Sequence, residues 1–542
     1  MLQIDGNHLT IEDVIAVARK QAAVELAEAA RERMLRSHAW VQEIVAAREP
    51  VYGINTGFGI FAEQRIPPQE SALLSRNLIL SHAVSTGPNL PEEVVRAAML
   101  IRANTLAIGY SGVRPEIVET LLSMLNHGVT PIVPSQGSLG SSGDLAPLSH
   151  LALVFTTDDE DRESESGFAD FLGQRMTGKA AMQAAGLPRL ILGPKEGLAV
   201  NNGATFSAAL AALAVYDAAH LLEVAEISLA MSLEAMLGVS AAFDQRLHAA
   251  RRHPGQQAVA ARVCELTQDS EMLDAAGRIQ DAYSLRCAPQ VQGAARDTLN
   301  YVRQVIEREI NAVTDNPLLF DPGEAISGGN FHGEPIGMVM DFLAIAMAEV
   351  GAISERRIFR MTDGKLNAGL PPMLVDKRRI FRMTDGKLNA GLPPMLVDKP
   401  EDAGLNSGMM MPQYTAASLV LENQTLANPD SVHSLPTSAE QEDHNANSMT
   451  AARNARQVIE NTAHVLAIEV YCAARAVDLR LRQMPGAKLG RGVALAYQRI
   501  REKIPYRAGD TWWGPQIETA RDIILQEDFV QMPEDLRRVH AR

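Results

Sequence analysis

A short stretch rich in glycine and serine contains the most unusual chemistry that this sequence could perform. Residues 137–150 read GSLGSSGDLAPLSH, and Ser141, Ser142 and Gly143 follow one another within it. Because glycine lacks a Cβ atom and tolerates strained backbone angles, the Gly143 amide nitrogen can reach the Ser141 carbonyl carbon. Ring closure and loss of the Ser142 hydroxyl would leave an exocyclic methylidene, an electrophile made from the backbone. A helix beginning just downstream would strengthen that electrophile through the helix dipole.

Two plainer interpretations of this stretch stay open on the residues alone. It could be a flexible turn that leads into a helix, with Ser142 or Asp144 near the N-cap. It could also be a phosphate-binding loop, although no lysine follows the glycines and Asp144 has the wrong charge for that role.

The stretch resembles the GSxGASGDLAPLSH signature of the aromatic amino acid ammonia-lyases. The resemblance implies that Ser141, Ser142 and Gly143 cyclise autocatalytically into 4-methylidene-imidazole-5-one (MIO), with no external cofactor. Ser141 replaces the usual alanine, a residue that contributes only its carbonyl group to the ring. The resemblance also implies the mainly α fold of the fumarase/aspartase-like superfamily. In that fold a long central helix bundle accompanies a smaller mixed N-terminal domain, which carries the MIO loop and active-site loops.

Further motifs appear in the order that the family has them, and the resemblance assigns catalytic roles to their residues. Residues 51–59, VYGINTGFG, are similar to the YGxNTGFG loop, in which Tyr52 would be the base that removes a β-proton. A phenol has an ordinary pKa near 10, so Tyr52 needs a positive or hydrogen-bonding environment to act as a base. Residues 195–203, KEGLAVNNG, would place Asn202 against the MIO oxygen, and Ala204 replaces the usual threonine.

Two more motifs supply expected contacts to the substrate. Residues 280–286, QDAYSLR, resemble a family motif in which Gln280 and Arg286 contact the substrate and Tyr283 lies near the MIO. Arg286 would clamp a carboxylate with two parallel hydrogen bonds, although a structural salt bridge is the commoner fate of a lone arginine. Residues 327–333, SGGNFHG, would place Phe331 in the substrate pocket.

The substrate expectation depends on His82, in NLILSHA (77–83), and on Glu442, in QEDH (441–444), which resemble histidine-specific members of the family. A buried imidazole needs polar partners, and a carboxylate can accept its N–H, whereas a phenyl ring would leave that carboxylate unpaired. The implied reaction is the non-oxidative deamination of L-histidine to urocanate and ammonia by a carbon–nitrogen lyase. After QEDH the chain reads NANSM where the family usually has VSMG. The alternatives are a phenylalanine or tyrosine ammonia-lyase or aminomutase, or an inactive scaffold protein.

Composition and charge limit the partners that this chain could have. With 50 Lys+Arg and 65 Asp+Glu the net charge is −15, which argues against nucleic-acid or anionic-membrane partners. No secretory signal sequence is expected, because MLQIDGNHLT contains no basic region followed by an apolar run. No membrane span is expected, because the most apolar long stretch, 206–240, carries four acidic residues. Three scattered cysteines and no third ligand beside Glu442 and His444 indicate no disulfide framework and no metal site. The expectation is a cytoplasmic enzyme with a small-molecule amino acid substrate, and the resemblance implies a homotetramer with shared active sites.

Helical periodicity dominates the chain, and any sheet is expected to be short and peripheral. Long helices are predicted over 11–47, 206–240, 336–361 and 449–482, with 206–240 near the centre of a bundle. The predicted segments are an N-terminal domain over 1–200, a helix bundle over 201–482 and a C-terminal helical segment over 483–542. The acidic run 157–167 is predicted to be a solvated surface loop.

One segment of 22 residues occurs twice in succession, because 356–377 and 378–399 are identical. A single pair of repeats is too few for a solenoid. The chain therefore has a working length of 542 − 22 = 520 residues. Glycines and a Pro-Pro pair prevent one continuous helix, so the surplus copy is predicted to form an extruded loop with one helical turn at RRIFRM.

Overall fold

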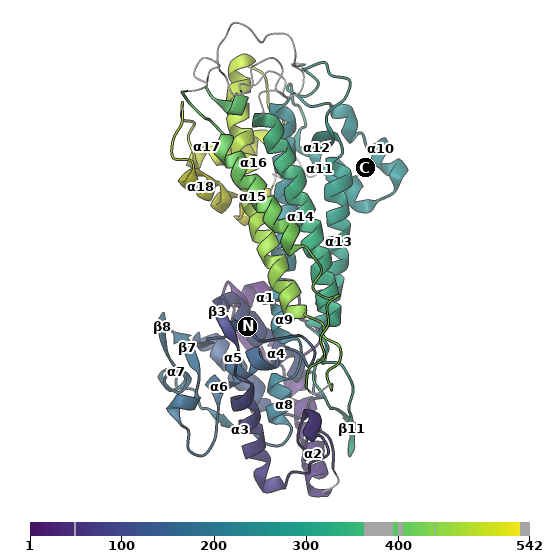
Figure 1. Cartoon of the computed structure of the whole chain (residues 1–542), viewed down its shortest axis with the longest axis vertical. Helices are drawn as coiled ribbons and strands as arrows, with labels where there is room; N and C mark the ends of the chain where they lie inside the picture. Colours follow the sequence, from purple (N-terminus) through teal and green to yellow (C-terminus); the bar gives the residue numbers. More distant parts are fainter. Residues whose placement is uncertain (48–49, 363–393, 399–404, 439–440, 532–542) are drawn as a thin grey trace. The chain divides into compact units, whose positions relative to one another are not determined.

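The computed structural model describes residues 1–47, 50–362, 394–398, 405–438 and 441–531 (Figure 1). The chain divides into two compact units, and each is assembled from three separate segments. Unit 1 comprises Met1–Tyr216, Val302–Asp341 and Pro429–Arg456, and unit 2 comprises Asp217–Tyr301, Phe342–Asn428 and Gln457–Arg542. The predicted boundaries after residues 200 and 482 divide the chain into continuous segments, whereas the compact units are discontinuous in sequence. Those boundaries therefore stay a prediction.

Helices form most of the described structure, which confirms the mainly α fold. Those that lie wholly in unit 1 are α1 (Ile11–Ala18), α2 (Glu28–Ala47), α3 (Ser71–His82), α4 (Glu92–Ala107), α5 (Pro115–His127), α6 (Leu145–Phe155), α7 (Gly178–Ala184) and α8 (Glu196–Asn201). Those that lie wholly in unit 2 are α10 (Gln245–Arg251), α11 (Pro254–Leu266), α12 (Tyr283–Arg286), α15 (Met410–Leu426), α17 (Arg491–Lys503), α18 (Gly514–Ile524) and α19 (Glu527–Val530). The unit boundaries fall inside α9 (Thr205–Ala235), α13 (Ala288–Glu309), α14 (Glu334–Thr362) and α16 (Ser448–Gln483).

The described strands are two to four residues long and pair in small sheets, as the weak alternation predicts. Two pairs are parallel, β1 (Leu2–Ile4) with β2 (Val24–Leu26) and β6 (Thr156–Thr157) with β9 (Leu190–Ile191). The others are antiparallel: β3 (Thr86–Asn89) with β5 (Pro134–Gln136), β4 (Thr130–Pro131) with β7 (Phe168–Phe171) and β8 (Gln174–Thr177), and β10 (Leu318–Asp321) with β11 (Glu324–Ile326).

One predicted long helix, over 11–47, is wrong because it breaks into α1, β2 and α2. Gln21 has a φ of +54° between the two helices, a backbone angle that a continuous α-helix cannot contain. The residues that follow pair with the N-terminal strand in parallel, Leu2 opposite Val24 and Ile4 opposite Leu26. A pairing 22 residues away in sequence thus overrides the local helix propensity of this alanine-rich stretch.

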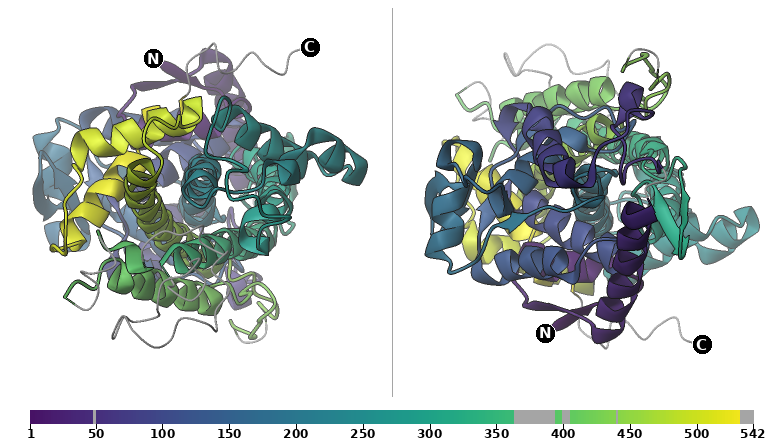
Figure 2. Two further views of the ribbon diagram at one scale, coloured as in Figure 1. Left: turned by 90° about the horizontal axis from the view of Figure 1, so that it is seen from above. Right: turned by 90° about the horizontal axis from the view of Figure 1, so that it is seen from below.

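Those parts of the long helices that belong to unit 2 lie side by side and are joined by polar contacts. In Figure 1 α13, α14 and α16 run along one another, and Figure 2 shows them nearly end-on. The Ser232 hydroxyl on α9 donates to Glu469 on α16 at 2.7 Å, and Arg357 on α14 donates to the same carboxylate at 2.8 Å. Arg357 and Glu469 are both fully buried. Because removing one partner would leave a buried charge uncompensated, this contact fixes how α14 and α16 align.

Helix α9 confirms the prediction of a central helix, since nearly all of its residues are buried. By length and apolar composition α9 and α14 could each span a membrane, but 72% and 67% of their most apolar windows are buried inside the protein. That degree of burial is typical of core helices in a packed chain.

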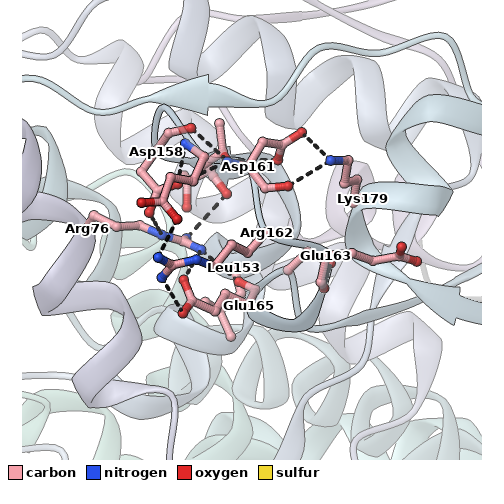
Figure 3. Close-up of polar contacts among 12 residues, drawn as sticks. Arg76, Leu153, Asp158, Asp161, Arg162, Glu163, Glu165 and Lys179 are labelled. Atoms are coloured by element: carbon pink, nitrogen blue, oxygen red, sulfur yellow. Dashed lines mark hydrogen bonds and ion pairs between the residues drawn. The ribbon is translucent and has the colours of Figure 1, made fainter.

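The acidic run 157–167 is in part the solvated loop that the sequence predicts, since Asp159, Glu160 and Glu163 are exposed. Its other carboxylates contact two buried arginines, Arg76 and Arg189, whose side chains are 3% and 5% exposed. Asp158 and Glu165 each lie 3.7 Å from Arg76, and Asp161 pairs with Lys179 (Figure 3). Asp161 also pairs with Arg189. Because Arg76 belongs to α3, these contacts anchor the helix that ends at His82.

The repeat is described only at its two ends. The start of the first copy, residues 356–362, completes α14, in agreement with the predicted helix over 336–361. The end of the second copy, residues 394–398, packs into unit 2, where Arg475 donates to the Leu396 carbonyl at 2.6 Å. The predicted extruded loop lies outside the described residues.

Deleting residues 378–399 is expected to stabilise the chain modestly. The deletion removes residues 394–398, but the identical residues 372–376 of the first copy can take their place. The connection between the two described ends then shortens from 31 residues, 363–393, to nine. Loop-closure entropy then favours folding by about 1 kcal/mol. Thermal unfolding of the two chains measures the change. A segment of glycine and serine that replaces 363–384 at equal length is the control, and a deletion that lowers both melting temperature and activity would show that the second copy is structural.

The stability of unit 2 is expected to fall as pH rises above 6, because of Glu234 on α9. Burial raises the pKa of Glu234 to about 8, opposed by hydrogen bonds from the Gly490 amide and Ser270. The folded state therefore keeps a proton that the unfolded chain releases near pH 4.5, and this stabilisation is lost as pH rises through about 8. Between pH 6 and 9 the loss is on the order of 2 kcal/mol. Chemical denaturation of Glu234→Gln should show a flatter pH dependence than the parent, whereas Glu223→Gln, half-buried on the same helix, should match the parent.

Candidate active site

Unit 1 encloses a cavity of about 1180 Å³ that brings together residues from distant parts of the sequence. Loops and helix ends supply its walls, as expected when a rigid scaffold carries function on its connections. Seven of the predicted site residues line it: Tyr52, His82, Ser141, Ser142, Asn202, Phe331 and Glu442.

The tripeptide at the cavity wall is pressed against the segment that follows α8. Gly143 has a φ of +77° and Gly203 a φ of +127°, angles that residues with a side chain rarely adopt. A Cβ atom on Gly143 would lie 2.1 Å from the Gly203 carbonyl carbon. The Asn202 side-chain amide donates to the Ser142 carbonyl oxygen at 2.8 Å, so Asn202 lies beside the tripeptide. Both glycines are therefore required for this close approach.

Asp144 fixes the other end of the tripeptide. It is fully buried and accepts hydrogen bonds from the Ser138 hydroxyl at 2.7 Å and from the Ser207 amide at 2.8 Å. Burial raises the pKa of Asp144, and these hydrogen bonds oppose the rise. Asp144 occupies the N-cap position of α6, yet its side chain makes no capping hydrogen bond. The plain capping interpretation of this stretch therefore does not account for Asp144.

Glu442 lies beside both the tripeptide and His82, the other predicted recognition group. The Ser142 hydroxyl donates to Glu442 Oε1 at 2.7 Å. Burial lowers the pKa of His82 at the end of α3, although the Leu78 backbone and the charge of Glu442 act in the opposite direction. The His82 Nδ1 atom lies 3.0 Å from the Ser81 hydroxyl. His82 is therefore favoured as a neutral ring that can exchange hydrogen bonds with a ligand.

Tyr52 lies in a turn after α2, and its surroundings only partly match what a base requires. A hydrogen bond from the Gly59 backbone favours the phenolate, but burial and the charge of Glu442 raise the pKa of Tyr52 overall. The described chain thus supplies the expected hydrogen bond but no positive charge that outweighs burial. A nearby cationic group would lower the pKa of Tyr52 and so activate this phenol.

Four predicted site residues are absent from the lining of this cavity, namely Gly143 of the tripeptide and three residues of unit 2. Gln280, Tyr283 and Arg286 belong to unit 2, where Tyr283 and Arg286 lie in the single turn α12. The Arg286 guanidinium lies 4.7 Å from the centre of the Tyr283 ring and donates to the Asp281 carbonyl at 2.9 Å. Tyr283 is 70% exposed. Of the four residues of α12, Ser284 and Leu285 are buried, so Tyr283 is its exposed side chain.

Sequence reasoning gave no role to two histidines that also line the cavity. The His332 and His444 rings stack with centres 5.9 Å apart, and a His332 ring nitrogen lies 3.2 Å from the His444 carbonyl oxygen. His332 directly follows Phe331 in SGGNFHG, and His444 ends the QEDH motif that contains Glu442. The available sequence signal was therefore that each histidine lies in the same motif as a predicted site residue. Within the described part of the chain, no group of three histidine, cysteine or carboxylate side chains could hold a metal ion.

The chain has extensive similarity to known proteins. The family model for aromatic amino acid lyases matches residues 9–378 and 376–502, and its two stretches meet at the junction of the repeats. A histidine ammonia-lyase from Caldanaerobacter subterraneus subsp. tengcongensis is 47% identical over 504 residues, which cover 92% of each protein.

Solved structures resemble the fold over nearly its whole length. The histidine ammonia-lyase from Trypanosoma cruzi matches with a TM-score of 0.85 and 34% identity, covering 99% of this chain and 96% of the other. The tyrosine aminomutase from Streptomyces globisporus matches with a TM-score of 0.86 and 34% identity, covering 98% and 97%. With a family model that spans most of its length and a cavity built from that family's motifs, the chain belongs to the aromatic amino acid lyase family.

Proposed function

We propose that this protein deaminates L-histidine to urocanate and ammonia, as a carbon–nitrogen lyase. The observation that carries the proposal is the position of Glu442 and His82 in the same cavity as the Ser141-Ser142-Gly143 tripeptide. A carboxylate and a neutral imidazole are polar partners for a buried imidazole substrate, whereas a phenyl or phenol ring would leave one of them unpaired. The histidine ammonia-lyase relative at 47% identity supports the same substrate.

The residues around the tripeptide fit the MIO group, which would form by autocatalytic cyclisation. Asn202 already holds the Ser142 carbonyl oxygen, which becomes the ring oxygen, and Gly203 leaves no room for a side chain on Gly143. The cyclised group supplies an electrophilic methylidene carbon, which makes the amine of an amino acid a better leaving group. The residues that would hold it are Asn202, Gly203 and Asp144.

Substrate binding would use both polar and apolar walls of the cavity. His82 and Glu442 would hydrogen-bond the imidazole, and Phe331 would pack against it. The Asn202 side-chain oxygen is buried without a hydrogen-bond partner in the described structure, so it is free to accept an N–H of the substrate. Gln280, Tyr283 and Arg286 would be supplied by a neighbouring subunit of a homotetramer, with Arg286 clamping the carboxylate.

Tyr52 would then remove a β-proton from the bound substrate. Its hydrogen bond from Gly59 orients the phenol oxygen. Because burial opposes ionisation of Tyr52, the positive charge that activates it would come from the same neighbouring subunit.

A spectroscopic assay tests the proposed activity. Purified full-length protein mixed with L-histidine should show a rise in near-ultraviolet absorbance from urocanate, with an equal amount of ammonia. A flat trace beside turnover of phenylalanine or tyrosine would overturn the histidine assignment, and a β-amino acid product would indicate an aminomutase. Intact mass tests the cofactor separately, since cyclisation removes two water molecules and an unshifted mass would contradict it.

Glu442→Gln is expected to lower kcat/KM for histidine between about fivefold and a hundredfold. The amide keeps the size of the side chain but removes the charge that favours a cationic imidazole, and its NH₂ group opposes one ring N–H donor. Steady-state kinetics measures the loss, with Glu116→Gln on the exposed start of α5 as the control. An unchanged kcat/KM for histidine would remove Glu442 from substrate recognition.

A further inference from the structure

The side chain of Asn445 contacts the tripeptide but does not line the cavity. Its amide nitrogen donates to the Ser141 hydroxyl at 2.6 Å. Both residues are buried, with Asn445 1% exposed and Ser141 4% exposed. A hydroxyl and an amide that are buried together in this way depend on each other for a hydrogen-bond partner.

Asn445 is itself held in one orientation. Its side-chain oxygen accepts from the Leu435 amide at 2.7 Å, and its backbone amide donates to the Ser434 hydroxyl at 2.9 Å. The side-chain nitrogen is therefore aimed at Ser141 by two contacts on the same loop. Asn445 does not line the cavity, so any effect it has on catalysis must pass through Ser141.

The segment that contains Asn445 contacts the tripeptide loop at two further points. The Asn447 amide donates to the Leu139 carbonyl at 2.7 Å, and the Ser448 hydroxyl lies 2.9 Å from the Ser207 hydroxyl. Ser207 in turn donates to Asp144, the residue that follows Gly143. Residues 445–448 thus hold the loop on both sides of the tripeptide.

The two departures from the family's motifs meet in this contact. Ser141 replaces an alanine, and Asn445 begins the NANSM segment that replaces VSMG. An unpartnered Ser141 hydroxyl would cost free energy in the buried loop, and an unpartnered Asn445 amide would cost a similar amount. Ser141 and Asn445 therefore suit each other. Ser141 would lack a hydrogen-bond partner beside the family's usual segment, and Asn445 would lack one beside the usual alanine.

We infer that Asn445 is a positioning residue for MIO formation, acting by holding Ser141 in place for ring closure. The inference rests on the proposed function. In the first step a bond forms between Gly143 N and Ser141 C, and the Ser141 carbonyl oxygen leaves as water with the Gly143 and Ser142 amide hydrogens. In the second step the Ser142 hydroxyl leaves as water with the Ser142 α-hydrogen. The Asn445 contact fixes the carbon at which the first bond forms.

A double-mutant cycle on the full chain tests this role. Parent, Ser141→Ala, Asn445→Val and the combined variant are made by cell-free synthesis, with Asn300→Val on the exposed face of α13 as the control. Mass spectrometry of the soluble protein follows, over time, the loss of two waters from the peptide that contains residues 141–143. Each single variant should cyclise about fivefold more slowly or worse, the effect of one unpaired buried polar group. The combined variant should regain most of the parent rate, because it restores an apolar pair.

The outcomes separate this inference from the proposed function. Single variants that cyclise at the parent rate, while the parent turns over histidine, would overturn the role of Asn445 and leave the proposed activity intact. A parent that never loses two waters would instead overturn the cofactor. Melting temperatures of the same samples distinguish slow cyclisation from unfolding. If Asn445→Val is insoluble, Ser141→Ala decides, because it removes the same hydrogen bond from the smaller side chain.

Discussion

Ser142→Ala is expected to fold normally and to lose essentially all histidine turnover. Ser142 supplies both the carbonyl that Asn202 holds and the hydroxyl that must leave, and alanine keeps only the first. Without the hydroxyl no methylidene carbon forms, so the amine of the substrate stays a poor leaving group. We expect a fall in kcat on the order of 10³-fold or more, the scale seen when a group that reacts covalently is removed.

Two measurements on this variant distinguish a chemical defect from a folding defect. Its intact mass should lack the loss of two waters that the parent shows, while its melting temperature should stay close to the parent value. Ser123→Ala on α5 is the matched control, since it makes the same change away from the cavity. Histidine turnover at the parent rate by Ser142→Ala would exclude an electrophile made from this tripeptide.

Features governed by local sequence could be predicted well. The bounds of α14 and α16 differ from prediction by one or two residues at each end, because a 3.6-residue apolar period over some thirty residues admits few alternatives. The tripeptide motif also predicted the helix that begins directly after it, and α6 begins at Leu145.

Features governed by distant contacts could not be predicted. The strand β2 interrupts a helical pattern only because residues at the N-terminus pair with it. The acidic run 157–167 has the composition of a solvated loop, yet Arg76 and Arg189 reach it from sequence positions far away. In both cases the deciding partner lies outside any window from which a local pattern can be read.

The candidate site shows the same division between motif and environment. Seven residues that the motifs predict line one cavity. The pKa of Tyr52, however, depends on burial and on Glu442, and neither effect can be read from a motif. Asn445 was visible in the sequence only as a departure from a family motif. Its contact with Ser141 became apparent from the fold, since 304 positions separate the two residues.

Tyr52→Phe is expected to lower kcat by about 10²- to 10⁴-fold while leaving the two-water mass loss unchanged. The phenyl ring keeps the packing of the side chain in the turn, but it cannot accept the β-proton. Because the Tyr52 hydroxyl makes no hydrogen bond to residues 141–143 in the described structure, cyclisation should proceed in the variant. Loss of turnover with normal cyclisation would therefore assign Tyr52 to the reaction itself and not to maturation of the site.

The pH dependence of the parent and of Tyr52→Phe gives a second, independent readout. Burial and Glu442 raise the pKa of Tyr52, and the proposed cationic group of the neighbouring subunit would lower it. Below the resulting pKa, the ionised fraction grows about tenfold with each unit of pH. The parent should therefore gain activity as pH rises from 7 to 9, and the residual activity of Tyr52→Phe should lack that gain. Tyr301→Phe, half-exposed on α13, controls for loss of a phenol elsewhere. A Tyr52→Phe enzyme that keeps the parent's rise with pH would show that another group removes the β-proton, because no phenol would then be present at position 52 to titrate.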